Sequence, residues 1–374
     1  MTVRRSTHLY LHVPYCAAKC PYCDFNSIAG RDAEHAAYVD ALLSEVRTLP
    51  RGPYATVFVG GGTPTMLGAR DLARLMGGVR DRIALDDRYE WTCEANPGSV
   101  DAEKFRLLAE HGVNRLSLGI QSTDDRWLKF LGRVHDSRQA ERALALARAA
   151  VPRVSADIII GLPGQGDEDI AADLALYRRH DLAHASVYHL TFEPGTEFHA
   201  LRARGAMTET DPVTSRRQLA LVTERLAAFG LDAYETSNFA RGGEASRHNL
   251  AYWHQRDYHA AGAGAVSTVD RRRVTRHKHP AAYIDGAARG DTAWKVEALD
   301  DRAILTEAWM LGLRLASGVA RARLRELGDD EGRWLDRARV LAGEGLVAID
   351  DEAVRLTPAG RPVQDDVTVY LMPS

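Results

Sequence analysis

Three cysteines near the start of the chain have a spacing that suits metal binding. They are Cys16, Cys20 and Cys23, in the pattern C-x3-C-x2-C, and the chain of 374 residues contains four cysteines in all. Three thiolates on a short loop can hold three irons of a [4Fe–4S] cluster. The fourth iron would then lack a protein ligand and could take a small molecule, as the open position of a catalytic zinc site does. The spacing therefore favours a cluster with one open iron.

Two other roles for these cysteines stay open. Disulfide pairing would leave one of the three thiols over, and disulfides are typical of secreted proteins. A structural zinc ion would need a fourth ligand, and only His12 is near, because no second C-x2-C pair follows. The fourth cysteine, Cys93, stands alone, and we expect it to pack as a small apolar side chain.

Composition and charge point to an ordinary globular protein of two domains. Hydrophobic residues make up 45% of the chain and charged residues 26%, and the net charge is −3, which gives no general attraction to nucleic acid or anionic membranes. The first seven residues contain no apolar segment of a signal peptide, and no apolar run is long enough to span a bilayer. We therefore expect a cytoplasmic protein, with peripheral attachment to a membrane left open.

Short β-branched segments alternate with longer amphipathic ones over the first half of the chain. Repeated βα units of this kind predict a parallel sheet, and six of them suggest an α/β fold with a full or partial (β/α) barrel. The expected strands are 8–13, 55–59, 89–94, 115–120, 154–160 and 186–190. The expected helices are 34–48, 69–82, 102–111, 137–149 and 168–179.

Residues that could take part in binding or catalysis lie where these strands end. The cysteine loop follows the first strand, and the segment GGGTPT at 60–65 follows the second. Glu94 ends the third strand, Gln121 ends the fourth, and Asp157 lies in the fifth. Active residues of such barrels gather at the carboxyl ends of the strands. We therefore expect a single site at this end.

The pattern changes after residue 298, which we take as the end of a first domain at 1–298. The second domain, 299–374, is expected to have helices at 301–317 and 331–343 followed by strands at 345–350 and 353–357. This order resembles a winged helix, a shape that often binds DNA. However, residues 300–374 carry ten arginines, no lysine and fourteen acidic residues, a net charge of −4. A nucleic-acid partner is therefore not expected.

The cysteine loop, with Tyr22 before the last cysteine, resembles that of the radical S-adenosylmethionine (SAM) superfamily. Further matches are LYLHVP at 9–14, CPYCDFNS at 20–27, RLSLGIQS at 115–122 and GLP at 161–163. Together they resemble one branch of it, the radical-SAM haem chaperones (HemW-type) and oxygen-independent coproporphyrinogen III dehydrogenase. The resemblance spans nearly the whole chain and implies a partial (β/α) radical-SAM barrel with a small C-terminal helical, winged-helix-like domain.

The resemblance also implies which residues bind cofactors. The cysteines would hold the [4Fe–4S] cluster, and SAM would chelate the open iron. Tyr10, Tyr22, Gly61 and Glu94 match positions that contact this SAM. Five others match positions that contact a second SAM in the dehydrogenase, and whether this chain keeps that second site stays open: Gly62, Thr63, Gln121, Arg133 and Asp157. A structural ion pair between Arg133 and Asp157 is an alternative.

Two features separate the chaperones from the dehydrogenase. The dehydrogenase carries a further cysteine two residues after the third one, where this chain has Phe25. It also has a longer N-terminal extension, whereas 15 residues precede Cys16 here. Both differences favour the chaperones.

The segment HNLAYW at 248–253 resembles the H-N-x-x-Y-W signature of the haem chaperones. A neutral imidazole such as that of His248 is a good axial ligand for haem iron. Tyr252 and Trp253 can lie against a flat porphyrin. The alternative is a histidine that stabilises a turn beside core aromatics. A nearby basic run, 271–279, is expected to be a solvated loop.

We therefore expect a protein that binds haem and passes it to acceptor proteins, some of them membrane-bound. The alternative is the dehydrogenase, which decarboxylates two propionates of coproporphyrinogen III to vinyl groups. Whether the chain has enzymatic activity stays open, as does a homodimer.

Overall fold

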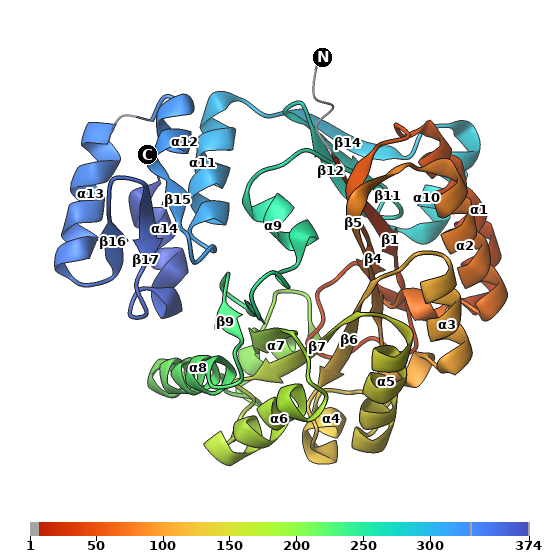
Figure 1. Ribbon diagram of the computed structural model, residues 1–374, viewed down its shortest axis with the longest axis horizontal. Coiled ribbons are helices and arrows are strands. Elements are labelled where there is room, and N and C mark those ends of the chain that lie inside the picture. The colour runs from red at the N-terminus through yellow and green to blue at the C-terminus, as the bar shows by residue number, and fades with distance from the viewer. Residues whose placement is uncertain (1–6, 330, 373–374) are drawn as a thin grey trace.

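The computed structural model describes residues 7–329 and 331–372 and contains all six predicted strands, which pair in parallel. Their order in the sheet follows their order in the chain, so each βα unit places its strand beside the previous one. Figure 1 shows the resulting curved sheet, a partial barrel. The strands are β1 (Thr7–Val13), β4 (Tyr54–Gly61), β5 (Leu85–Ala95), β6 (Arg115–Gln121), β7 (Arg153–Ile160) and β8 (His184–His189).

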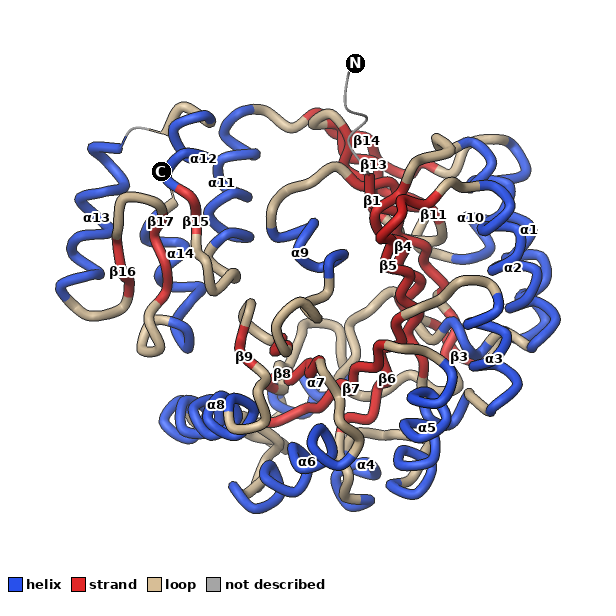
Figure 2. Tube along the Cα trace, in the orientation of Figure 1, coloured by secondary structure: helices blue, strands red, loops and turns tan. Residues whose placement is uncertain are grey.

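The sheet has further strands at both edges. Beyond β1 the strand β11 pairs in parallel, and β12, β13 and β14 follow antiparallel; beyond β8, β10 and β9 pair antiparallel. These strands extend the sheet, yet they do not close the barrel, whose opening faces the C-terminal domain in Figure 2. Their bounds are β9 (Asp232–Ala233), β10 (Asn238–Ala240), β11 (Tyr258–Ala261), β12 (Val266–Val269), β13 (Arg272–Arg276) and β14 (Ala293–Ala298).

The predicted helices are present within one or two residues of their expected ends, and they cover the outer side of the sheet (Figure 1). Local signals explain this agreement: Asp136 and Gln139, for example, form a capping box at the start of α5. These helices are α1 (His35–Thr48), α2 (Ala69–Arg82), α3 (Ala102–Glu110), α5 (Ser137–Ala150) and α6 (Asp167–Arg179). Others are α4 (Asp125–Phe130), α7 (Glu197–Ala203), α8 (Pro212–Ala227), α9 (Arg247–Trp253) and α10 (Pro280–Arg289).

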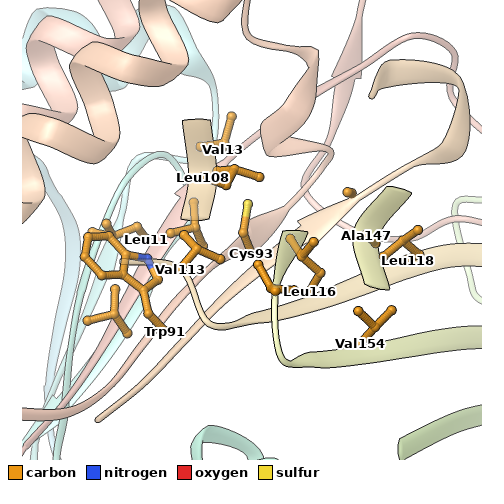
Figure 3. Packing of buried hydrophobic residues seen from close by; sticks show 14 of the residues in the cluster. Leu11, Val13, Trp91, Cys93, Leu108, Val113, Leu116, Leu118, Ala147 and Val154 are labelled. Atoms are coloured by element: carbon orange, nitrogen blue, oxygen red, sulfur yellow. The ribbon is translucent and has the colours of Figure 1, made fainter. Parts of the chain in front are cut away.

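The two faces of each strand have different roles, because successive side chains point to opposite sides. On β1, Leu9 and Leu11 are fully buried in the main core, whereas Tyr10 and His12 are on the other face, which lines the barrel interior. On β5, Cys93 is fully buried among Trp91 and the core leucines (Figure 3). The expectation that Cys93 is a packing residue is confirmed.

The C-terminal domain has its own hydrophobic core, in which Trp309 and Trp334 pack edge to face. The first helix, expected to reach residue 317, ends at Gly312, because the chain turns so that Gly318 (φ +73°) can approach the carbonyl of Val354. The elements are α11 (Asp301–Gly312), β15 (Val319–Ala320), α12 (Arg321–Glu326), α13 (Glu331–Gly343), β16 (Val347–Ile349), β17 (Ala353–Leu356) and α14 (Gln364–Leu371).

The basic run expected to form a solvated loop is largely a strand, β13, so that expectation was wrong. Arg276 is buried and its Nε donates to Glu45 at 2.9 Å, while Arg273 makes two hydrogen bonds to Glu307. Arg276 is therefore neutralised inside the fold, and Arg273 is partly exposed beside its acidic partner; Arg271, Arg272, Lys278 and His279 of the run are exposed.

Residues 1–6, for which the sequence predicts no signal peptide, lie outside the described residues. Within the described ranges, no helix is long and apolar enough to cross a membrane.

Candidate cluster site and interdomain cleft

The three loop cysteines line one cavity, at the carboxyl ends of the parallel strands. Cys16, Cys20 and Cys23 share an open cavity of about 130 Å³ with residues from β4, β5, β6 and β7. All three are free and partly exposed. Of the residues that the resemblance implies, the cavity also contains Tyr22, Gly61, Gly62, Thr63, Glu94, Arg133 and Asp157.

The cysteine loop is held in shape by one lysine. Lys19 Nζ donates to the carbonyl of Phe25 at 2.7 Å and to Ser27 Oγ at 2.9 Å, and lies 3.9 Å from Cys23 Sγ. The backbone N–H of Cys23 donates to the carbonyl of Cys20 at 3.1 Å. Lys19 and this backbone hydrogen bond therefore fix the shape of the loop that carries the three thiols.

The donor set fits a [4Fe–4S] cluster better than a single ion. Among the described residues no three His, Cys, Asp or Glu side chains converge closely enough to hold one metal ion. A cluster places its thiolate ligands on separate irons, so the sulfurs need not converge. The free thiols, their common cavity and the lysine beside them are what such a cluster requires.

The glycine-rich turn after β4 is packed too closely for any other residue. Gly61 has φ +111°, and a Cβ there would lie 2.2 Å from the ring of His12. A Cβ at Gly62 would lie 2.8 Å from the carbonyl oxygen of Pro14. The turn therefore exposes bare backbone to the cavity, as expected for a segment that contacts a cofactor directly.

Two carboxyl groups in the cavity wall favour their neutral forms more than usual. Glu94 Oε2 accepts from the backbone N–H of Gly61 at 3.0 Å, and burial raises its pKa to about 7. Asp157 accepts from Ser117 Oγ at 2.9 Å, and burial raises its pKa to about 6. Both groups can therefore exchange protons or hydrogen bonds with a ligand near neutral pH.

Arg133 connects the cysteine loop with the neighbouring strands. Its Nη1 donates to Cys20 Sγ at 3.5 Å, and its Nη2 donates to the carbonyl of Gly119 at 3.0 Å and to Asn96. Arg133 and Asp157, both among the described residues, form no ion pair, so the structural alternative for them was wrong.

Sequence reasoning missed Asn96 and Ser117. Asn96 Nδ2 donates to Thr63 Oγ1 at 2.6 Å, and Thr63 Oγ1 lies 3.6 Å from Cys16 Sγ. Alternation of side chains along the strands could have predicted both residues. Asn96 is two residues after Glu94, just beyond β5. Ser117 lies in β6, two residues before Gly119, which also lines the cavity.

Gln121 has a strained backbone at the end of β6. Its φ is +69°, and its Oε1 is buried without a hydrogen-bond partner. The next turn is fixed by Asp173, which accepts from Ser122 Oγ at 3.0 Å and from Thr123 Oγ1 at 2.7 Å. Strain of this kind gathers at functional sites, and the free oxygen is available to a ligand.

The two tyrosines implied for SAM binding have different positions. Tyr22 lines the cavity and packs near Phe198. Tyr10 lies deeper: its hydroxyl donates to His12 Nδ1 at 2.9 Å, because His12 Nε2 must donate to the carbonyl of Asn26. Tyr10 therefore supports the ring that packs against Gly61 and is not among the residues that line the cavity.

His248, the implied haem residue, lies inside the barrel. It is 1% exposed, its Nδ1 lies 2.7 Å from Thr56 Oγ1, and its Nε2 lies 2.9 Å from the hydroxyl of Tyr252. Burial, with a smaller effect of His8, lowers its pKa to about 3. Since both ring nitrogens are hydrogen-bonded, neither is free for iron in this arrangement. Its role in haem binding stays a prediction.

Trp253, the last residue of the same helix, faces a second and larger space. This cleft of about 960 Å³ lies between the amino ends of β1 and β4 and the C-terminal domain. The guanidinium of Arg314 lies over the Trp253 ring, 4.6 Å from its centre. Gln255 Nε2 donates across the boundary to the carbonyl of Ile304 at 2.9 Å. The molecule thus has a cavity at one end of its strands and a cleft at the other.

Comparison with known sequences identifies two families along the chain. The profile of the Radical SAM superfamily matches residues 10–177, and that of the HemN C-terminal domain matches residues 299–363. The first covers the cysteine loop and the strands around the cavity. The second covers most of the helices and strands of the C-terminal domain, which has its own hydrophobic core.

Similar proteins over nearly the whole chain include the "Heme chaperone HemW" of Bacillus subtilis (strain 168), 33% identical over 96% of this chain and 97% of that protein. The protein of the same name from Escherichia coli (strain K12) is 38% identical over 74% of this chain and 75% of its own. A solved structure described as coproporphyrinogen III oxidase (HemN) from Escherichia coli superposes with a TM-score of 0.84 at 22% identity, covering 99% of this chain and 91% of that one. At this identity the likeness shows a shared fold.

Proposed function

Since the chain belongs to the HemW-type family of the radical-SAM superfamily, we propose that it is a haem chaperone that binds haem and delivers it to acceptor proteins. The observation that carries this proposal is the similarity to proteins named haem chaperones over 96% of the chain, with both family profiles included. We also propose that the two profiles mark two domains, 1–298 and 299–374.

Superfamily membership implies a [4Fe–4S] cluster and SAM. We propose Cys16, Cys20 and Cys23 as the cluster ligands. When bound at the open iron, SAM supplies the radical chemistry of the superfamily, and the protein supplies its placement. We propose that the bare backbone at Gly61 and the carboxyl of Glu94 hold it. A second SAM at Gln121 and Arg133 stays a proposal, supported by the unpartnered Gln121 Oε1.

The second candidate function is coproporphyrinogen III dehydrogenase, which the fold alone would allow. The residue at the position of the dehydrogenase's extra cysteine argues against it. Phe25 stands there, lines the cavity and is 65% exposed. A phenyl ring offers neither a thiolate nor a proton, so any step that needs that thiol cannot take place here.

An anaerobic haem titration of the cluster-containing chain tests the proposal. We expect saturation of the Soret band at about one haem per chain, followed by loss of that haem to an added apo-acceptor such as an apocytochrome. The matched assay supplies coproporphyrinogen III, SAM and a reductant. If the chain consumes the porphyrinogen and shows no saturable haem binding, the chaperone proposal is wrong and the dehydrogenase function takes its place.

Partners and location belong to the same proposal. We propose haem acceptors that include membrane-bound proteins, a cytoplasmic location with peripheral membrane contact, and no nucleic-acid partner, in line with the negative charge of the C-terminal domain. Sedimentation with and without haem tests a homodimer.

A further inference from the structure

Four side chains form a hydrogen-bonded series that leads from the HNLAYW segment to the interdomain cleft. Tyr252 is bonded to His248 and His248 to Thr56. Thr56 Oγ1 also lies 2.9 Å from Nδ1 of His8, at the amino end of β1. Thr56 and His248 are buried, whereas His8 is partly exposed and lines the cleft. His248 and Tyr252 therefore reach the cleft through His8, whereas Trp253 of the same segment lines it directly.

His8 has one ring nitrogen fixed and the other free. Its Nε2 makes no hydrogen bond to any residue that the structure describes, and it is not among the buried atoms without a partner. Burial, with smaller effects of the Arg247 and Arg256 charges, lowers the pKa of His8 to about 4, so the ring is neutral at neutral pH. Histidines that bind metals usually have this form, with the second nitrogen held by a neighbouring group.

The series permits two directions of proton donation, and one of them frees His8 for a metal. If His8 Nδ1–H donates to Thr56, the Thr56 hydroxyl donates to His248 Nδ1, and His248 Nε2–H donates to Tyr252. Nε2 of His8 is then an unprotonated acceptor that faces the cleft. In this direction every ring nitrogen and hydroxyl from Nδ1 of His8 to Nε2 of His248 keeps a partner. The Tyr252 hydroxyl then accepts from His248, and its own proton has no acceptor among the described residues.

The cleft is large enough for a porphyrin. Its volume of about 960 Å³ lies at the upper end of the range typical of small-ligand pockets, about 300–1,000 Å³. Trp253, whose ring is covered on one face by Arg314, is partly exposed in the cleft wall, and the side chains of Leu315 and Val319, 4% and 3% exposed, also line the cleft. Arg256 is exposed, forms no ion pair with the described residues and lies near His8, so it is available to a propionate.

We propose that haem binds in this interdomain cleft with Nε2 of His8 as its axial ligand, while His248 and Thr56 act as positioning residues and Arg256 pairs with a propionate. This inference rests on the proposed haem-binding function. It refines that function, because it moves the iron ligand from His248 to a histidine outside the HNLAYW segment.

Anaerobic haem titration of full-length, cluster-containing variants tests this assignment, with difference absorption and EPR spectra as readouts. We expect His8→Ala to lose the histidine-ligated spectrum, with affinity at least about 100-fold lower, and added imidazole to restore the spectrum. Thr56→Val, which keeps the side-chain shape, should weaken binding about 10-fold, whereas Thr56→Ser should behave as the parent, because outer groups of this kind change metal affinity by about 10–100-fold.

Two further histidine variants make the test decisive. His259 lies beside Leu9 on β11 and does not line the cleft, so His259→Ala should bind haem as the parent does. His254→Ala removes the other histidine of the cleft and should retain the ligated spectrum. Loss of that spectrum in His254→Ala or His248→Ala, with His8→Ala unchanged, would overturn the assignment and leave the chaperone proposal intact. Absence of haem binding in the parent chain would overturn both.

Discussion

The two ends of the barrel differ in how their residues are distributed along the chain. The cavity at the carboxyl ends takes its thiols from one loop of eight residues and its bare backbone from one run of glycines. The cleft at the amino ends combines residues near positions 8, 55, 253 and 320, from three separate parts of the fold. A site built from contiguous motifs can be recognised in a sequence. A site built between domains becomes visible when the chain is folded.

The largest expected effect is the loss of iron when a loop cysteine is replaced, in contrast to replacement of the buried Cys93. Cys16→Ala, Cys20→Ala and Cys23→Ala should each lower the iron content from about four per chain to nearly zero, because each removes a ligand of one iron. Iron and sulfide analysis with absorption spectra after anaerobic reconstitution measures this. Cys93→Ala is the matched control and should keep its iron while losing about 1 kcal/mol of stability in the core. Iron retained in all three loop variants would remove the cluster assignment.

Replacing the central glycine tests how rigid the cavity wall is. Gly61→Ala should reduce the free energy of unfolding by about 3 kcal/mol, because its φ of +111° is unfavourable and the new methyl group would overlap the His12 ring. Denaturant unfolding of the cluster-free chain measures the loss. Gly242→Ala, where no atom lies within 4 Å, should change stability by less than about 0.5 kcal/mol. Equal stability of the two variants would contradict this packing.

The buried carboxyl of Glu94 should make the stability of the cavity end depend on pH. Burial raises its pKa in the folded chain to about 7, so the folded state holds this proton more tightly than the unfolded state. The stabilisation is therefore complete below about pH 4.5 and is lost as the pH rises through about 7. In Glu94→Gln that loss, about 2–3 kcal/mol, should disappear.

Unfolding of the cluster-free chain between pH 4.5 and 8 measures this effect. Glu224→Gln, an exposed change on α8, should keep the pH profile of the parent. A profile of Glu94→Gln that follows the parent would show that another group titrates.

The smallest expected effect concerns the boundary that forms the cleft. Arg314→Lys keeps the positive charge near Glu235 but loses the flat guanidinium over Trp253, so we expect about 0.5–1 kcal/mol less stability. Arg302→Lys, an exposed change on α11, the helix that precedes Arg314, is the control and should have no measurable effect. Thermal unfolding compares the two; an unchanged Arg314→Lys would mean that the stacking does not stabilise this boundary.

The βα pattern predicted the barrel well because each unit is specified locally. The apolar alternation of β1 and the capping box of α5 lie within a few residues of the elements that they define. The C-terminal domain was harder, because α12 and α14 are short and depend on packing around Trp309 and Trp334 rather than on their own pattern. The basic run was misjudged since its partners Glu45 and Glu307 are distant in sequence.

The same reasoning explains the sites. Motif spacing led to the cysteines and the glycine turn, and alternation on the strands would also have led to Asn96. It did not lead to His8, because nothing around position 8 distinguishes it from other partly exposed strand residues. Its environment comes from Thr56 and His248, which lie 48 and 240 positions away.

The inward face of β1 carries His8, Tyr10 and His12 in succession, one for the cleft, one for the interior and one behind the glycine turn. Because side chains alternate strictly along a strand, a shift of the whole of β1 by one residue would turn all three outward at once. Both ends of the barrel therefore depend on the same register of β1. In evolution, neither end can change the register of β1 without changing the other.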